Sequence, residues 1–149
     1  MKIQGSHKIS AEREAVYRQL LDPEALARAL PGCEKLTPNP DGSYQAVMKV
    51  GVAAVKGTYQ GRVEIPDRKP PERFRMRVNA QGKGSFLKGE GEVVLSGSDG
   101  ETTVSYSGET QVGGLLAAVG QRMIQAASRQ IVSQFFQAFA RQIQGGATS

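Results

Sequence analysis

The amino-acid sequence predicts an α+β fold, in which a strongly curved antiparallel sheet of about seven strands wraps around one long C-terminal helix and two short helices follow the first strand. Between Cys33 and Val112 apolar and polar residues alternate, which is typical of strands with one covered and one solvated face. After Gly113-Gly114 the apolar residues recur at helical spacing over a long segment. Because the chain offers only one long helix, we expect that helix to cover the apolar face of the sheet.

The N-terminal part of the chain predicts one strand and two short helices. The segment KIQGSHKI (2–9) alternates weakly and indicates the first strand. A first helix is expected over residues 11–21. Asp22-Pro23 marks the start of the second helix, because an Asp side chain caps early helical amides and Pro tolerates the first helical position. Pro31-Gly32 ends it.

The alternation of the strands is clearest in ERFRMRVNA (72–80), where apolar side chains face one way and polar side chains the other. The inward set is Phe74, Met76, Val78 and Ala80, and the outward set is Arg73, Arg75, Arg77 and Asn79. Turn-forming residues cluster at 38–42, 66–71 and 97–100. These clusters separate strands of the length that a small antiparallel sheet requires.

The long C-terminal helix is expected over residues 115–143, which would span roughly 43 Å at 1.5 Å per residue. Arg122, Arg129 and several glutamines interrupt its apolar residues, so a transmembrane span is disfavoured. The apolar stripe consists of Ile124, Ala127, Ile131, Phe135 and Ala138. The phosphate-binding patterns G-x-G-x-x-G and GK[ST] are missing around Gly113-Gly114. We therefore expect these glycines to permit a tight corner between strand and helix.

Composition limits the classes of partner and the cellular compartment. The 149 residues carry a net charge of +5 and an isoelectric point near 9.6, which suits an anionic membrane surface, an acidic protein or nucleic acid. Trp is absent and aromatic residues make up 6%, so we expect no stacking platform and no nucleic-acid partner. A single Cys and the lack of an apolar N-terminal run favour a cytoplasmic location. We expect one domain over residues 1–143 and a disordered tail over 144–149.

Several glycines occupy inward positions of the predicted strands, including Gly57, Gly61, Gly89, Gly91 and Gly108. Glycine in a strand marks either a close backbone approach or missing side-chain filling. A long helix over a glycine-lined concave sheet would then enclose a hydrophobic cavity, although the glycines would equally let the helix sit closer and leave no space. The residues predicted to line a ligand are Met48, Tyr59, Val63, Phe74, Met76, Val78, Gly91, Val93, Tyr106, Met123, Ile124, Ala127, Ile131 and Phe135.

Catalytic and metal-binding patterns are scarce. One His and one Cys exclude a His/Cys zinc cluster, and a pair of Cys33 with His7 is disfavoured because lone cysteines are usually inert and buried. Glu90 and Glu92 share a strand face opposite to Val93, so we expect them in solvent. The three outward arginines of residues 73–77 predict a solvated face, with docking to an acidic partner or a membrane as the second interpretation. We predict no catalytic residue, no metal and no cofactor.

Three segments together resemble one family. They are LPGCEKL (30–36), KGTYQGRVEI (56–65) and TQVGGLLAAVGQRMI (110–124), and the sequence is similar over residues 1–143 to the family of the G subunit of carbon monoxide dehydrogenase. That family belongs to the START-like, polyketide cyclase-like ligand-binding superfamily with a helix-grip fold. The resemblance implies an accessory protein of a molybdenum hydroxylase that recruits the enzyme to the cytoplasmic membrane. A C-terminal extension of many members has no counterpart here, so we expect only weak peripheral membrane contact.

The preferred hypothesis is a non-enzymatic accessory protein that binds an apolar ligand, a lipid or a quinone, and assists membrane recruitment or electron-acceptor delivery. The second hypothesis is a cyclase or dehydratase that acts on a hydrophobic substrate in the same cavity. Such an enzyme needs polar groups inside, and Tyr59, Tyr106 and His7 are the inward candidates. The third hypothesis is an interaction protein with a filled core.

Overall fold

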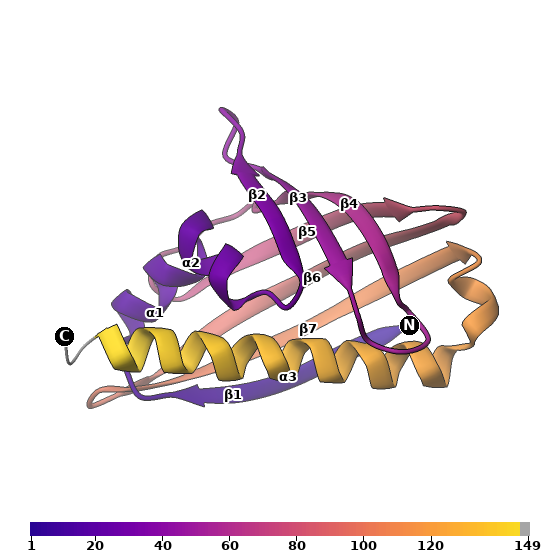
Figure 1. The fold of residues 1–149 in the computed structure, drawn as a ribbon. Helices are drawn as coiled ribbons and strands as arrows, with labels where there is room; N and C mark the ends of the chain where they lie inside the picture. Colours follow the sequence, from indigo (N-terminus) through magenta and orange to yellow (C-terminus); the bar gives the residue numbers. More distant parts are fainter. Residues whose placement is uncertain (147–149) are drawn as a thin grey trace.

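The computed structural model describes residues 1–146 and contains one seven-stranded antiparallel sheet, as the sequence predicted (Figure 1). The strands are β1 (Lys2–Ile9), β2 (Cys33–Pro38), β3 (Tyr44–Val50), β4 (Gly57–Glu64), β5 (Arg73–Gly82), β6 (Ser85–Ser98) and β7 (Glu101–Gly114). Their order across the sheet is β1-β7-β6-β5-β4-β3-β2. Strands β2 to β7 therefore form a meander, and β1 joins it beside β7.

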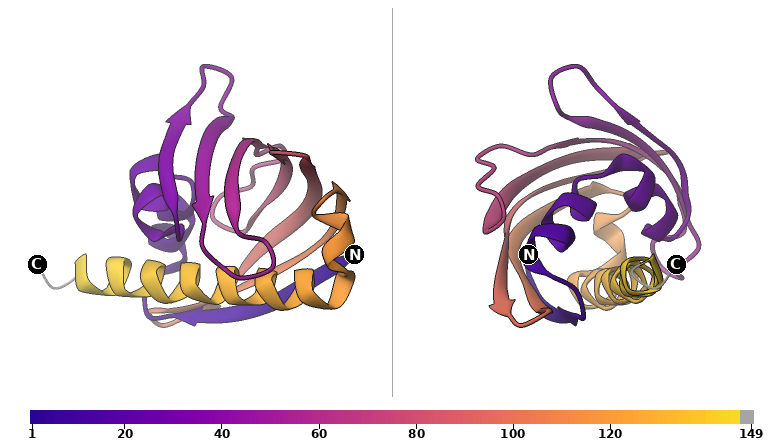
Figure 2. Two further views of the ribbon diagram at one scale, coloured as in Figure 1. Left: turned by 45° about the vertical axis from the view of Figure 1, so that its right-hand side comes forward. Right: turned by 90° about the vertical axis from the view of Figure 1, so that its left-hand side faces the viewer.

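The sheet curves around one long helix, which confirms the predicted helix-grip architecture (Figure 2). The helices are α1 (Arg13–Leu20), α2 (Pro23–Ala29), the short 3₁₀ helix η1 (Ala117–Val119) and α3 (Gln121–Gly146). Helix α3 runs along the concave side of the sheet, and α1 and α2 lie near its C-terminal half (Figure 1). The backbone of α3 contacts α2 most extensively and β1 and η1 less so.

Helix α2 begins as the sequence predicted. Oδ1 of Asp22 accepts a hydrogen bond from the backbone amide of Glu24 at 3.0 Å, and Pro23 takes the first helical position. The carboxylate thus satisfies an amide that has no partner within the helix. Because α2 packs on α3, this cap holds one end of the fold in place.

We expect Asp22→Ala to lower the free energy of unfolding by about 1 kcal/mol, the usual effect of removing a cap. Asp22→Asn retains a side-chain oxygen and is the matched control, with stability close to that of the native chain. Urea unfolding followed by circular dichroism measures both variants. Equal losses in Asn and Ala variants would show that the cap contributes nothing.

The start of α3 differs from the sequence prediction. The helix begins at Gln121 rather than at residue 115, because residues 115–120 form a turn and the short helix η1. Gly114 and Gly120 flank this connection with φ of +70° and +96°, a left-handed conformation that interrupts a helix and favours glycine. A side chain at Gly114 would also collide with the backbone of Gly84. Of the predicted pair Gly113-Gly114, it is Gly114 that makes the tight corner, and Gly120 makes a second one before α3.

The two faces of β5 have the predicted parity. Phe74 is 3% exposed, whereas its neighbours Arg73 and Arg75 are exposed. On the outer face, Nη1 of Arg75 lies 3.8 Å from Oε2 of Glu92, and Nε of Arg77 lies 3.0 Å from Oε1 of Glu90. The three outward arginines of β5 therefore lie on a solvated surface, where they form ion pairs with Glu90 and Glu92 of β6.

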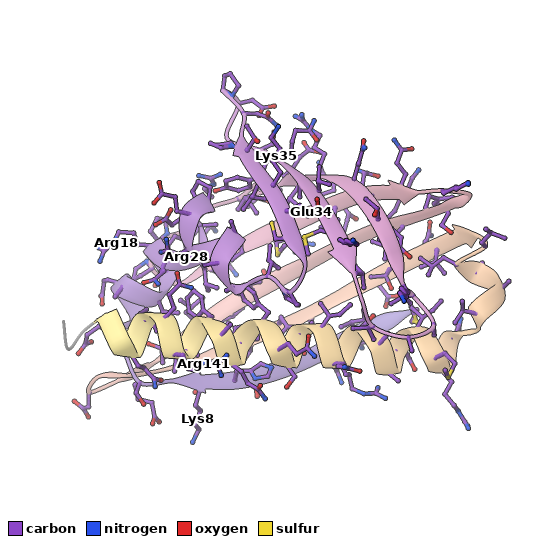
Figure 3. The ribbon with its side chains drawn as sticks, in the orientation of Figure 1. Lys8, Arg18, Arg28, Glu34, Lys35 and Arg141 are labelled. Atoms are coloured by element: carbon purple, nitrogen blue, oxygen red, sulfur yellow. The ribbon has the colours of Figure 1, made fainter. Side chains whose placement is uncertain are left out.

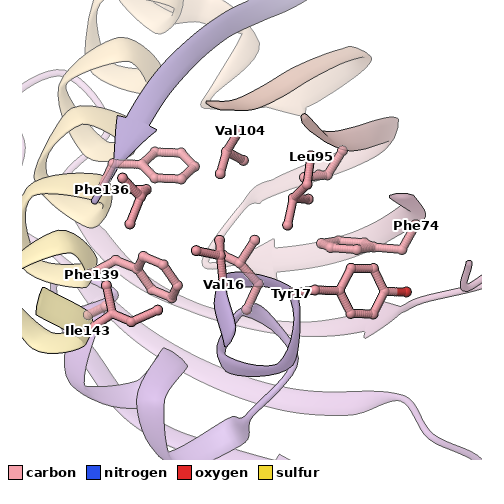
Figure 4. Packing of buried hydrophobic residues seen from close by; sticks show 12 residues of the cluster. Val16, Tyr17, Phe74, Leu95, Val104, Phe136, Phe139 and Ile143 are labelled. Carbon is pink, nitrogen blue, oxygen red and sulfur yellow. The ribbon is translucent and has the colours of Figure 1, made fainter. Parts of the chain in front are cut away.

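The packed core lies at one end of the molecule, where α1 and the C-terminal half of α3 meet the sheet (Figure 4). Its members are Ile9, Val16, Tyr17, Leu20, Ala29, Phe74, Val93, Leu95, Val104, Phe136, Phe139 and Ile143. Val16, Val104 and Phe139 are fully buried. The ring of Tyr17 meets that of Phe74 edge-on, with centroids 5.7 Å apart.

Helix α3 continues through residues 144–146 of the segment that we predicted as a disordered tail. Ile143 is buried, and Oε1 of Gln144 accepts a hydrogen bond from the amide of Ser10 at 3.0 Å, so the last turn is tied to the fold. Residues 147–149 lie outside the described residues. Within residues 1–146, the helices lack the combination of length and apolar character that crossing a bilayer demands.

Candidate ligand-binding surface

Burial changes steadily along the inward face of the three central strands. On β6, Leu95 and Val93 are 2% and 9% exposed, whereas Gly91, Gly89 and Leu87 are only half-buried. The same change follows Phe74 on β5 and Val104 on β7. A filled core would bury these inward residues as fully as it buries the first ones. One half of the concave face is therefore packed, and the other half stays accessible beneath α3.

We call this accessible part of the concave face the inner surface. It includes nine of the predicted ligand-lining residues. All nine are half-buried: Met48, Tyr59, Val63, Met76, Val78, Gly91, Tyr106, Ile131 and Phe135. Strand register brings the sheet members into adjacent rows, since Met48 pairs with Tyr59, Val63 with Val78, and Met76 with Gly91. The inner surface is mostly apolar, with a few polar atoms.

The other five predicted residues lie elsewhere. Phe74 and Val93 belong to the packed core, and Ile124 and Ala127 of α3 are 3% and 4% exposed. Met123 is 52% exposed at the start of α3, contrary to the expected inward position. Its neighbour Ile124 takes the inward position, because consecutive helical residues point about 100° apart.

Two of the inward glycines, Gly91 and Gly108, serve close contact between strands. Gly91 of β6 stands opposite Gly108 of β7, and a Cβ added at Gly91 would lie 2.7 Å from the carbonyl oxygen of Ser107. Such a distance would force the backbone of β7 to shift. Gly91 and Gly108 therefore allow the two strands to approach, and they also leave this row of the inner surface without side chains.

The polar atoms of the inner surface gather on β1 and β7. The imidazole of His7 stacks on Phe136 with ring centroids 4.2 Å apart, and the Tyr106 ring lies nearly parallel to it at 6.1 Å. Within the described residues the Tyr106 hydroxyl has no hydrogen-bond partner, yet it is not a fully buried atom. It is therefore free to donate to a bound molecule. A close approach of Tyr106 to Gly5 explains why β1 carries glycine there.

Burial sets the protonation of these groups. Loss of hydration lowers the pKa of His7, so its imidazole is neutral at pH 7, and raises the pKa of Tyr106, so its hydroxyl keeps its proton. The site therefore presents uncharged donors and acceptors to a ligand. Sequence reasoning left His7 out of the ligand set, although its inward parity in β1 was visible.

Tyr59 differs from Tyr106, although the sequence made both of them inward polar candidates. The Tyr59 hydroxyl donates to the carbonyl oxygen of Val55 at 2.8 Å. This bond ties the loop between β3 and β4 back onto β4. Tyr59 thus contributes its ring to the inner surface, while its hydroxyl stabilises the loop.

A pocket of about 180 Å³ opens at the flank of α3. It lies between the β3–β4 loop and the middle of the helix and is lined by Pro31, Gly32, Val50, Gly51, Val52, Gln130, Ile131 and Gln134. Ile131 is the one predicted ligand residue that it touches. In the described part of the chain no group of three His, Cys, Asp or Glu side chains is placed to hold a metal ion.

Solved structures share this fold. A conserved protein from Geobacillus kaustophilus is 33% identical, with a TM-score of 0.93 over 97% of this chain and 96% of that chain. A protein from Chromobacterium violaceum is 21% identical, with a TM-score of 0.74 over 95% and 96% of the two chains. A START superfamily protein from Mycobacterium smegmatis is 11% identical, with a TM-score of 0.74 over 97% of each chain. The fold is therefore of the START-like class.

The family follows from the sequence match. The family model for CoxG, the G subunit of carbon monoxide dehydrogenase, matches residues 5–144, and the chain belongs to this family. A comparison with curated proteins gave no match. Family and fold together indicate a ligand-binding accessory protein, and membership of the CoxG family is consistent with a role other than catalysis.

Proposed function

We propose that this protein is a non-enzymatic accessory protein of a carbon monoxide dehydrogenase-type molybdenum hydroxylase. It holds an apolar ligand, a lipid or a quinone, on the inner surface. It acts in the cytoplasm, with weak peripheral contact at the inner face of the cell membrane. There it assists recruitment of the enzyme or delivery of an electron acceptor.

The observation that carries this proposal is the change in burial along β5, β6 and β7. Leu95 and Val104 are fully packed, whereas Leu87, Val78 and Tyr106 of the same sheet face remain half-buried. Apolar side chains gain about 25 cal/mol for each Å² removed from water. A ligand that covers the inner surface recovers this free energy, which the isolated fold leaves unused.

The polar atoms favour a ligand that carries a carbonyl group. Small-molecule sites are mostly apolar with a few placed polar groups that fix orientation. The Tyr106 hydroxyl can donate a hydrogen bond to a carbonyl oxygen, and the flat ring of a quinone can continue the parallel arrangement of His7 and Phe136. The apolar tail then lies along Met76 and Val78.

Mass spectrometry of the protein after gentle, detergent-free purification tests the proposal. We expect a co-purifying lipid or quinone, and saturable binding when decylubiquinone is titrated into the emptied protein. A protein that carries no such molecule and binds neither decylubiquinone nor a fatty acid would contradict it.

We expect Tyr106→Phe to weaken decylubiquinone binding about three- to tenfold, because one hydrogen bond contributes about 0.5–1.5 kcal/mol. Tyr59→Phe is the matched control. Its hydroxyl already donates to Val55, so the affinity should stay within about twofold of the native value. Isothermal titration calorimetry measures the affinity of both variants. A larger loss in Tyr59→Phe than in Tyr106→Phe would show that the ligand is bound by the Tyr59 hydroxyl and not by that of Tyr106.

The second candidate is a cyclase or dehydratase acting on a hydrophobic substrate at the same surface. It is favoured by the proximity of His7 and Tyr106, a neutral imidazole and a phenol that could move a proton. Turnover of a polyketide-like substrate that is lost in both His7→Phe and Tyr106→Phe would support the enzyme over the accessory protein.

A further inference from the structure

The outward side of α3 carries cations and carboxamides but no acidic group. The chain has no Asp or Glu after Glu109, and the helix contains three arginines and seven glutamines. Within residues 126–144 the exposed positions are Ala126, Arg129, Gln130, Gln134, Gln137, Arg141 and Gln144. This side of the helix therefore has nothing of its own that compensates the charge of its arginines.

Hydrogen bonds hold the neighbouring elements against the C-terminal half of this helix. On one flank, the amide of Ser10, directly after β1, donates to Oε1 of Gln144 at 3.0 Å. On the other flank, Nε of Arg28 in α2 donates to Oε1 of Gln142 at 2.8 Å. The end of α3 therefore shares one continuous surface with β1 and α2.

The exposed cations of these three elements lie together. Figure 3 shows Arg28 of α2, Arg141 of α3 and Lys8 of β1 in one line across the molecule. Glu34 and Lys35 of β2 lie outside this surface, and their opposite charges offset each other. We call the surface the cationic face, and its members are the exposed polar residues Lys8, Arg28, Arg129, Gln130, Gln134, Gln137, Arg141 and Gln144.

The cations of this face have no acidic partner among the described residues 1–146. The ion pairs found there do not involve the lysine or the three arginines of the cationic face. Glu24 stands one turn before Arg28 on α2, yet the guanidinium of Arg28 bonds to a carboxamide of α3. The arginines of β5, by contrast, each face a glutamate of β6. Four charges of the cationic face are therefore available to an external anion.

Guanidinium and carboxamide groups together suit a protein surface that carries carboxylates. A guanidinium binds a carboxylate through two parallel hydrogen bonds, and each carboxamide offers both donors and an acceptor to a peptide backbone. Arginine is enriched at protein interfaces, whereas lysine is depleted. The cationic face, with three arginines and one lysine, has the composition of such an interface.

We propose that the cationic face binds an acidic segment of a partner protein. Carboxylates of that segment pair with the guanidinium groups, and the glutamine side chains between them bond to its backbone. Arg129 and Arg141 stand about 18 Å apart along the helix at 1.5 Å per residue. The segment therefore presents its carboxylates over a length of this order.

Three other occupants fit this face less well. Nucleic acid carries one charge on about every 1.7 Å of its axis, far more densely than the arginines of α3 are spaced. A bilayer surface favours apolar side chains that insert, but the large apolar side chains that are exposed in the described residues all lie outside the cationic face. A symmetric dimer through this face would bring equal charges together.

Docking at this face goes beyond the proposed function, because it needs no ligand. Along α3, Gln130 and Gln134 are exposed on the outward side, whereas Ile131 and Phe135 belong to the inner surface. The helix therefore separates the two sites. An acidic segment can bind while the inner surface is occupied.

Fluorescence anisotropy of a labelled acidic peptide tests the inference. The probe is a peptide of roughly 20 residues with Glu at every third or fourth position, long enough to span both arginines of α3 even as a helix. The same peptide with every Glu replaced by Gln is the neutral control. We expect saturable binding of the acidic peptide that weakens between about 0.05 and 0.15 M salt, and no binding of the neutral one.

Variants of matched charge locate the binding surface. Arg129→Gln/Arg141→Gln should weaken binding of the acidic peptide at least about fivefold, because it removes two carboxylate contacts. Arg73→Gln/Arg75→Gln is the control, since it removes the same charge from the ion-paired outer face of β5, and its loss should stay within about twofold. Lys8→Gln leaves α3 untouched, and we expect it to weaken binding about two- to threefold.

Equal losses in the two arginine variants, equal binding of the neutral peptide, or no binding of the acidic peptide would overturn the inference. So would a DNA duplex of about 20 base pairs, or phosphatidylglycerol vesicles, that bound the native chain more tightly than the peptide and lost binding in Arg129→Gln/Arg141→Gln. Titration of decylubiquinone separates this site from the proposed function. A variant that loses the peptide but keeps decylubiquinone supports a separate docking site, and a native chain that binds the peptide but not decylubiquinone refutes the proposed function alone.

Discussion

Phe74→Asp is expected to unfold the protein. Phe74 is 3% exposed in the packed core and contacts the ring of Tyr17. Removing a buried Phe side chain costs about 3–5 kcal/mol, and an unpaired carboxylate in its place adds a further penalty. Since domains of this kind are stable by only about 5–15 kcal/mol, little or no native protein should remain. Far-UV circular dichroism and soluble yield measure the loss, because the chain has no Trp for fluorescence.

The neighbouring variant Arg75→Asp is the control, because it introduces the same side chain one position along β5 on the outer face. Arg75 is exposed and loses an ion pair with Glu92, and such surface pairs are worth about 0–1 kcal/mol. We expect its urea midpoint to stay near that of the native chain. If Arg75→Asp were the more damaging change, the strand parity would be reversed. Phe74→Leu gives a graded loss should the Asp variant fail to accumulate.

The fold could be predicted because it follows from two repeat patterns of apolar residues, the two-residue repeat of strands and the 3.6-residue repeat of helices, together with a few turn residues. Alternation in 72–80 gave the correct parity of β5, and helical spacing after Gly114 gave one long helix. A half-polar meander with one helix has few ways to bury its apolar face. The Asp22 cap is a local interaction and needed no tertiary information.

Other features depended on contacts that no local pattern encodes. Residues 115–120 have apolar, helix-compatible side chains, yet the left-handed Gly120 and the amide of Leu115 bonded to Gly84 keep them out of α3. The predicted apolar stripe of the long helix included Phe135 but not Phe136 or Phe139. The structure buries Phe139 completely in the core and leaves Phe135 half-buried at the inner surface.

The polar contacts of the candidate site were hardest to predict. Tyr59 and Tyr106 have equal inward parity, but the conformation of the β3–β4 loop places the carbonyl oxygen of Val55 against the Tyr59 hydroxyl, which is therefore occupied. His7 joins Tyr106 because β1 pairs with β7, a contact between segments that lie far apart in the sequence. Such pairing follows from topology rather than from spacing.

Glycine positions show the same limit. An inward glycine in a strand either leaves space that a side chain would fill or allows two backbones to approach closely. The sequence alone does not distinguish these two cases. At Gly91 the distance of 2.7 Å from an added Cβ to the oxygen of Ser107 shows close approach. At Gly89 the nearest atom is the Thr110 methyl at 3.3 Å, which can move aside. The inner surface therefore has no side chain at Gly91. A side chain introduced there would displace the backbone of β7.

Replacing Ala80 tests the open inner surface directly. Ala80 is half-buried and points inward on β5 between Gly61 and Leu87. It already carries a Cβ, so a larger side chain can extend toward α3 without moving a strand. We expect Ala80→Phe to lower decylubiquinone affinity at least about tenfold, which corresponds to about 1.4 kcal/mol. Its free energy of unfolding should stay within about 1 kcal/mol of the native value, because an open surface can accept a ring that a packed core would reject.

Gly91→Phe is the matched contrast, since it adds the same ring two inward rows away on the neighbouring strand β6. Its Cβ would press on the backbone of β7, so we expect a loss of about 3 kcal/mol or more in the free energy of unfolding, at the upper end for overpacking. Urea unfolding of both variants together with the decylubiquinone titration separates the effects. A stable Ala80→Phe that has lost the ligand, beside an unstable Gly91→Phe, supports a binding surface under α3. An Ala80→Phe variant as unstable as Gly91→Phe would instead mean that side chains already fill the space under the helix, and a stable one that binds as the native chain does would place the ligand elsewhere.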